Sequence, residues 1–193
     1  MRQRTRELQY KVKELEGKDR IAHHMLSVNS LEETLELILQ IIADIIETDK
    51  AVVYLLDGDT PNAVAAIGAL QPKTIALQAK LKNLEQTPIH TQAFARVVEA
   101  REPVNIKDPK GKPIPPFAVV PILAGDDFLG FIEIANPESM GAVSPEEVKL
   151  VASFALQAAI AISDAQAQSN TKAWKDELEN VLKDVSDIED TGV

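Results

Sequence analysis

Hydrophobic residues recur at intervals of three and four in several segments of the chain, which is the spacing of one helix face. The broadest stripes lie in residues 31–46 and 145–165, so both segments are predicted as helices that pack on a core. Residues 8–26 and 174–188 carry narrower stripes on a polar background. A narrow stripe is typical of a helix that pairs with another helix.

Two capping boxes mark where the broad helices begin. Ser30 and Glu33 stand three residues apart at the start of the first, and Ser144 and Glu147 at the start of the second. In such a box the serine hydroxyl accepts the backbone N–H of the glutamate, and the carboxylate accepts the N–H of the serine. Pro145 follows at the first helical position, where its missing N–H is no loss.

Short β-rich segments lie between these helices. They are rich in β-branched and aromatic residues, and turn-forming residues separate them. Alternation along the first strand places Val53 and Leu55 on one face and Val52, Tyr54 and Leu56 on the other, and the pattern alone leaves open which face meets a pocket. The predicted strands are 51–56, 63–67, 103–106, 117–123 and 128–135, with turns at 57–59 and 125–127 and a helix over 91–100.

Composition divides the chain into three parts. Residues 1–28 carry seven Lys or Arg and four Asp or Glu, and we interpret them as a helical arm for coiled-coil dimerisation. A helix that packs on its own domain is the alternative. Residues 29–168 hold the predicted strands and form the domain. Residues 169–193 form a C-terminal helical extension, whose stripe is out of phase with Ile162, so the helix either breaks or rotates its contact face there.

The overall composition excludes several classes of function. The chain has 193 residues, a length that suits one domain with extensions, and a net charge of −10, which disfavours nucleic-acid binding. The absence of cysteine excludes disulfides, thiolate nucleophiles and zinc–thiolate sites. The charged N-terminus is no signal peptide, and no apolar run approaches the roughly 18–20 residues of a membrane span. We therefore expect a cytoplasmic protein without membrane or nucleic-acid partners.

Candidate catalytic chemistry is sparse. His23 and His24 are adjacent on a helix, so they point about 100° apart and do not chelate one metal in the usual way. His90 is a candidate haem ligand or a hydrogen-bonding group in a pocket. The acidic pairs lie in turns, and no glycine-rich phosphate loop or nucleophile–base pair occurs. We expect no catalytic residues and no metal site.

The order of these elements resembles the GAF family of signalling domains over residues of about 25–168. The stretch SLEETLELILQIIADIIETDKAVVYLLDGD is similar to the first helix and strand of that family. AREPVNIKD resembles its connection into the third strand. FAVVPILAGDDFLGFIEIANPESMGAVSPEEVKLVASFALQAAIAISDAQ resembles the closing hairpin and the final helix.

The resemblance implies an α+β fold. A central antiparallel sheet would carry the long N- and C-terminal helices on one face and a pocket roofed by short helices on the other. It also implies homodimers formed through the terminal helices. From the positions of the elements, the predicted ligand-binding residues are Ile89, His90, Phe94, Ile106, Asp108 and Phe117. No cofactor is assigned.

The sequence departs from the cyclic-nucleotide-binding members of the family. Asn136 matches their pattern, but Pro137 replaces a lysine, Val143 stands near a phenylalanine position, and Pro145 takes an aspartate position. Bilin attachment and reduction of methionine sulfoxide need cysteines, which this chain lacks.

The sequence thus predicts a non-catalytic sensory or regulatory module that binds a small molecule, dimerises and acts on a signalling partner, either alone or as a piece of a larger protein. A dimerisation scaffold without ligand is the first alternative. A cyclic-nucleotide or haem sensor is the second.

Overall fold

The computed structural model describes the backbone of residues 2–25, 30–46, 48, 50–58, 60–68, 88–107, 116–136 and 141–190. Side chains are described for the same residues except 2–7, 68, 88 and 178–190. The chain divides into two compact units, Met1–Ala161 and Ile162–Val193, and the boundary falls inside the last helix.

Along the chain, helices come before, between and after the strands. The elements are α1 (Arg2–Met25), α2 (Leu31–Ile46), β1 (Lys50–Asp57), β2 (Thr60–Gly68), α4 (Pro88–Ala100), β3 (Val104–Ile106), β4 (Phe117–Ala124), β5 (Asp127–Ala135) and α5 (Pro145–Asp190).

Among the described residues, five strands form one antiparallel sheet in the order β2-β1-β5-β4-β3. Two hairpins, β1/β2 and β4/β5, are joined through the pairing of β1 with β5. Gly58 and Gly125 take the left-handed conformation in the hairpin turns, with φ of 59° and 62°, a conformation that glycine adopts without strain. The predicted α+β class with a central antiparallel sheet is confirmed.

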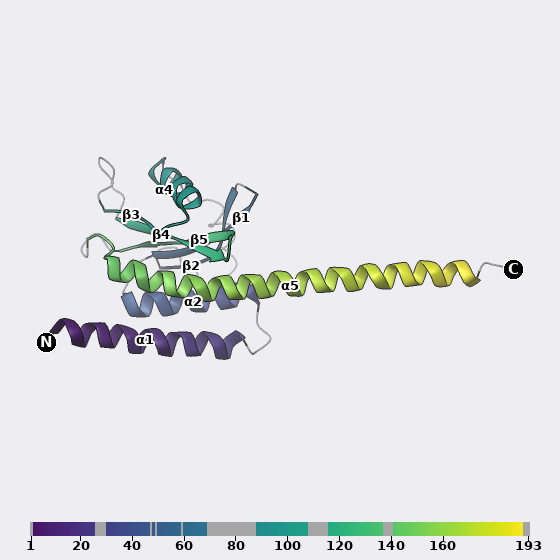
Figure 1. Cartoon of the computed structure of the whole chain (residues 1–193), viewed down its shortest axis with the longest axis horizontal. Coiled ribbons are helices and arrows are strands. Elements are labelled where there is room, and N and C mark those ends of the chain that lie inside the picture. Colours follow the sequence, from purple (N-terminus) through teal and green to yellow (C-terminus); the bar gives the residue numbers. More distant parts are fainter. Residues whose placement is uncertain are drawn as a thin grey trace. The chain divides into compact units, whose positions relative to one another are not determined.

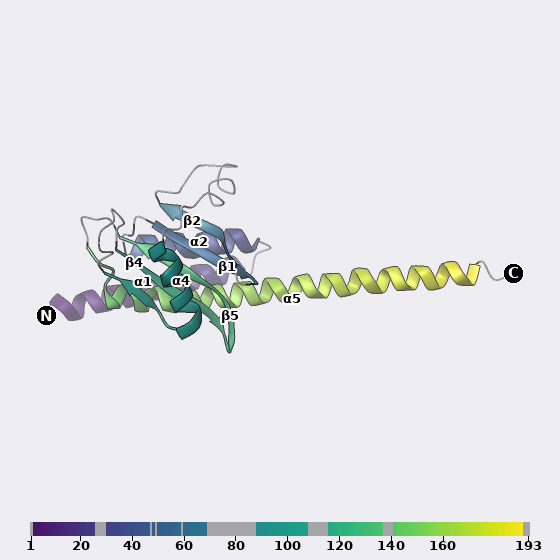
Figure 2. The ribbon, with the colours of Figure 1, turned by 90° about the horizontal axis from the view of Figure 1, so that it is seen from above.

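The two faces of the sheet are covered differently (Figure 1). Within the first unit, α2 and the beginning of α5 lie on one face, and α1 lies on the far side of α2. Helix α4 lies on the other face, over β3 and β4 (Figure 2). Successive strand residues point to opposite faces, so the sheet has a core on each side, and the one beneath α4 includes Val52, Phe94 and Phe117.

Helix ends follow local chemistry. Both capping boxes are present: Glu33 N–H donates to Ser30 Oγ and Ser30 N–H donates to Glu33 Oε2, each at 3.2 Å, and Ser144 pairs with Glu147 in the same way. The helix predicted to begin near Thr91 begins instead at Pro88, because proline is well suited to a first helical position. Of the two alternatives for the C-terminal helix, the break is wrong, because α5 is unbroken to Asp190.

Helix α1 presents two opposite faces. Gly17 and Ile21 are buried, and a Cβ placed on Gly17 would lie 2.6 Å from Ile41 Cγ2 of α2 and 3.0 Å from Phe154 Cζ of α5. This face packs on its own domain. The predicted stripe of Leu8, Val12 and Leu15 lies on the opposite face and is 47–67% exposed.

One segment of α5, Pro145–Glu177, is long and apolar enough to cross a membrane by length and composition alone. The sequence pattern predicted no such segment. Of its most apolar window, 44% is buried within the protein.

Candidate functional site

The face of the sheet beneath α4 carries an apolar cluster that contains most of the predicted ligand-binding residues. Phe94 and Phe117 are buried in it, and Ile89 and Ile106 are partly buried against it. His90 stacks on Phe117 with ring centroids 4.4 Å apart. The structure therefore brings five of the six residues together, while Asp108 lies outside the described residues.

The strand face that the sequence left open is decided by the packing. Val52 and Tyr54 are buried in this cluster and Leu56 packs against it, so these three residues face α4. Val53 is buried on the opposite face, towards the helices.

Several aromatic rings pack against one another within the cluster. The centroid of Phe131 lies 4.5 Å from that of Phe94 and 5.0 Å from that of Tyr54, distances typical of favourable ring pairs. Tyr54 is 2% exposed, and burial, with a smaller contribution from the charge of Glu133, raises the pKa of its hydroxyl. Tyr54 thus stays neutral at physiological pH.

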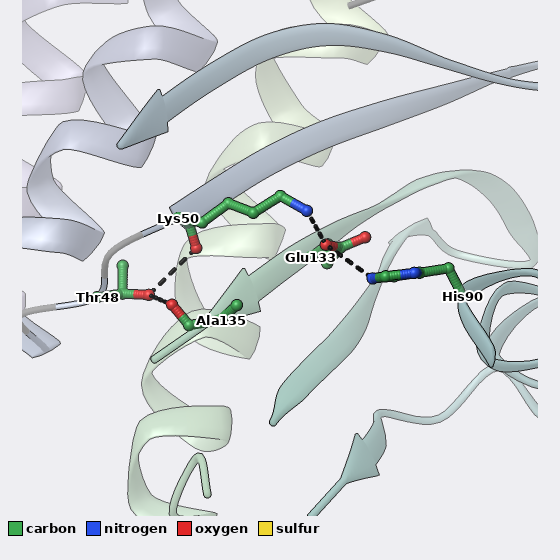
Figure 3. Close-up of polar contacts among 5 residues, drawn as sticks. All are labelled: Thr48, Lys50, His90, Glu133 and Ala135. Atoms are coloured by element: carbon green, nitrogen blue, oxygen red, sulfur yellow. Dashed lines mark hydrogen bonds and ion pairs between the residues drawn. The ribbon is translucent and has the colours of Figure 1, made fainter. Parts of the chain in front are cut away.

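A buried carboxylate interrupts this apolar surface (Figure 3). Glu133 lies in the middle strand β5 and is completely buried. Its Oε1 lies 2.5 Å from Lys50 Nζ and 3.7 Å from His90 Nε2, while its Oε2 is buried and has no hydrogen-bond partner. Lys50, Glu133 and His90 come from β1, β5 and α4, and we call them the charged cluster.

Sequence reasoning missed Glu133 and Lys50. Glu133 was taken as part of an apolar strand, although a glutamate between Ile132 and Ile134 is unusual in a strand that is paired on both sides. That position was the available signal, because a buried charge is rare unless it is paired or functional.

Thr48 positions the chain as it enters β1. Its hydroxyl donates to the carbonyl oxygen of Ala135 at 2.7 Å and lies 3.1 Å from that of Lys50 (Figure 3). This contact ties the segment after α2 to the end of β5. The charged cluster is therefore connected to the α2–β1 junction by only a few residues.

Burial lowers the pKa of His90. The negative charge of Glu133 opposes this shift, and the positive charge of Lys50 adds to it. Because the pKa is below the ordinary value of about 6.5, the unfolded chain takes up a proton at this position before the folded protein does as the pH falls. His90 therefore makes the protein less stable as the pH falls through about 6.5.

We expect this dependence to weaken in His90→Gln, because glutamine does not titrate. The measurement is the urea midpoint of both proteins at pH 7.5 and pH 5.5. The wild type should lose more stability than the variant between these two values, and parallel losses would contradict the assignment.

A hollow of about 870 Å³ lies on the helical side of the first unit. It is lined by α1, the end of α2 and the start of α5, including Tyr10, Val12, Ile46, Asn136 and Glu147. Asn136 is 4% exposed, and its Oδ1 has no hydrogen-bond partner. None of the five described candidates for ligand binding lines this hollow.

The described part of the chain contains no cluster of potential metal ligands. Within those residues, no three His, Asp or Glu side chains converge as metal ligands would. His23 lies on the exposed side of α1, with Nδ1 3.5 Å from Asp19 Oδ1.

Solved structures of similar fold come from signalling proteins and a phosphotransferase. The GAF domain of a phosphoenolpyruvate-protein phosphotransferase from Coxiella burnetii is 19% identical with a TM-score of 0.61, covering 82% of this chain and 98% of that one. A GAF domain described as that of a sensor histidine kinase from Pseudomonas syringae pv. tomato is 16% identical with a TM-score of 0.63, covering 89% and 97%. A segment of a methyl-accepting chemotaxis protein is 17% identical with a TM-score of 0.58, covering 77% and 97%.

At these identities the structures show a common fold and nothing more. No curated protein matches this sequence. The sequence model of the GAF domain family, however, matches residues 30–164, which is well over half of the chain. This match agrees with the antiparallel sheet, the helices on one face and the α4 layer on the other. The chain therefore belongs to the GAF domain family.

Proposed function

We propose that this protein is a non-enzymatic sensory or regulatory module that binds a small molecule beneath α4. The observation that carries the proposal is the charged cluster within an apolar layer. Complete burial of Glu133 with one oxygen unpartnered costs stability, and such a cost is typical of sites kept for binding rather than for folding. Membership in the GAF family and the kinship in fold with sensory proteins support a signalling role.

In this proposal, a ligand that contacts the charged cluster stabilises one arrangement of α4 and β5. Thr48 and Lys50 come shortly after α2 ends at Ile46, so a shift of Lys50 would be passed to the end of that helix. The ligand thereby biases the helical side of the domain, and a cytoplasmic signalling partner would respond to the change.

We also propose that the protein forms a homodimer through its terminal helices. The stripe of Leu8, Val12 and Leu15 on α1 is 47–67% exposed, and Leu8 and Val12 also line the hollow between α1, α2 and α5. Three large apolar residues at heptad spacing favour a partner helix. In α5, Leu156 and Ile160 are 57% and 44% exposed, and Trp174 is 69% exposed.

Native mass spectrometry of the full chain tests both parts of the proposal. We expect a dimer at micromolar concentration and a bound compound, or a rise in melting temperature with one member of a metabolite panel. Leu15→Glu should convert the dimer to monomer, because it places a charge in the apolar stripe. Gln40→Glu on α2 adds the same charge at an exposed position and is the control. A wild type that is strictly monomeric would refute the dimer.

A dimerisation scaffold without ligand is the second candidate function. The close aromatic packing of Phe94, Phe117 and Phe131, all 5% exposed or less, favours it. In that case no compound would be retained and no metabolite would raise the melting temperature, while the dimer would persist. A haem sensor is tested by growth with haem, and an absorption spectrum without a Soret band would exclude it.

A further inference from the structure

The unpartnered oxygen of Glu133 defines what kind of ligand the α4 face accepts. We infer that Glu133 Oε2 anchors the ligand by accepting a hydrogen bond, and that the ligand is a flat, neutral molecule with an N–H donor, such as a lactam or an imide ring. This inference rests on the proposed ligand binding beneath α4 and specifies its chemistry.

One oxygen of the Glu133 carboxylate, Oε2, is an unused hydrogen-bond acceptor. Oε1 is occupied by Lys50 Nζ at 2.5 Å, but Oε2 is buried without a partner. The side chain of Glu133 is 1% exposed, so bulk water does not compensate it. A carboxylate oxygen has room for further donors and donates none itself, so the complementary ligand atom carries a hydrogen.

The charges already present in the cluster indicate that the ligand is neutral. Lys50 neutralises Glu133 at direct contact, and the lowered pKa of His90 keeps its ring neutral at pH 7. The cluster therefore already has a net charge near zero. A cationic ligand would bury an uncompensated positive charge, which is costly in an apolar layer. A neutral N–H group satisfies the oxygen without adding charge.

The residues near Glu133 indicate that the ligand is flat. Across the sheet, Glu133 is paired with Val52 on β1 and Val119 on β4, and both belong to the apolar cluster. Phe131 lies two residues away on the same face, and the His90 ring stacks on Phe117. The residues that share this face of the sheet with Glu133 are thus aliphatic and aromatic, and such side chains suit a planar ring. Lys50 and His90, with side chains 22% and 12% exposed, connect the cluster to solvent.

Matched pairs of compounds test this inference. The probes are uracil, xanthine and 2-pyridone, each compared with its N-methylated counterpart: 1,3-dimethyluracil, caffeine and 1-methyl-2-pyridone. Methylation removes the donor and keeps the ring. We expect at least one N–H compound to bind the full-length wild type by calorimetry and to bind at least tenfold more tightly than its methylated partner, as the loss of one hydrogen bond to a charged group implies.

The protein variants test the residue. In Glu133→Gln an amide N–H₂ replaces the free oxygen, and binding of the N–H compound should fall at least tenfold. Glu99→Gln makes the same change at an exposed position on α4 and should bind as the wild type does. The double variant Lys50→Met/Glu133→Met removes the whole ion pair. We expect it to fold, to melt at a higher temperature than the ligand-free wild type, and not to bind.

The outcomes separate this inference from the proposed function. If a compound binds but methylation or Glu133→Gln changes nothing, the ligand site stands and the role of Glu133 is refuted. If the double variant melts lower than the wild type and still binds, Glu133 is a structural ion-pair residue and the inference is overturned. If no probe, no metabolite and no co-purified compound binds, the proposed ligand binding fails, and the inference fails with it.

Discussion

Gly130→Ala should lower the free energy of unfolding by about 3 kcal/mol, at the upper end of what added core atoms usually cost. A Cβ at Gly130 would overlap the Tyr54 carbonyl oxygen, far inside the sum of their van der Waals radii, and would lie 3.0 Å from the carbonyl carbon. These are backbone atoms of β1, so no side-chain rotation relieves the clash. The pairing of β1 with β5, which joins the two hairpins, would have to open.

Thermal unfolding and urea midpoints measure this effect. For a chain of this length, a loss of about 3 kcal/mol corresponds to roughly 6–12 °C in melting temperature. Gly125→Asn is the matched control, because a Cβ at Gly125 meets nothing within 4 Å and asparagine tolerates its left-handed backbone. Equal losses in the two variants would contradict the close approach of the strands.

Gly17→Ala should lower stability, although alanine is the better helix former. In an exposed helix the substitution would raise stability by about 1 kcal/mol. Here the added methyl group meets Ile41 and Phe154, both buried, and overpacking of that kind costs about 1–3 kcal/mol. The two effects have opposite signs, so the sign of the change shows whether α1 packs on the domain.

The measurement is again a urea midpoint, with Gly17→Leu as the larger substitution. Gly17→Leu should lower the midpoint further than Gly17→Ala. Glu16→Leu places the same side chain on the neighbouring exposed position and should change stability little. A rise in stability for Gly17→Ala would mean that α1 does not pack on α2 and α5 in solution.

The elements whose signals are local were predicted well. Both capping boxes involve residues three apart, so the sequence places donor and acceptor together without any tertiary contact. The two hairpins follow from turn residues between apolar runs. The ordered combination of these elements also led to the correct family over residues 30–164.

The start of α4 was placed too late, because the proline that begins the helix was interpreted as a break. For α1, the apolar stripe predicted a pairing face, but the stripe is exposed and the opposite face packs on the domain through Gly17 and Ile21. A glycine carries no hydrophobic signal, although its missing side chain is what permits the close approach. The predicted domain boundaries at 28/29 and 168/169 stay predictions.

The sequence by itself determined the fold class and the starts of α2 and α5, because these follow from periodicity, capping and the order of elements. Only the tertiary structure decided which face of β1 meets α4 and which polar groups gather there. Lys50, His90 and Glu133 are separated by 40 residues or more along the chain, and only the pairing of β1 with β5 beneath α4 brings them into contact. Their chemistry therefore exists only in the folded protein.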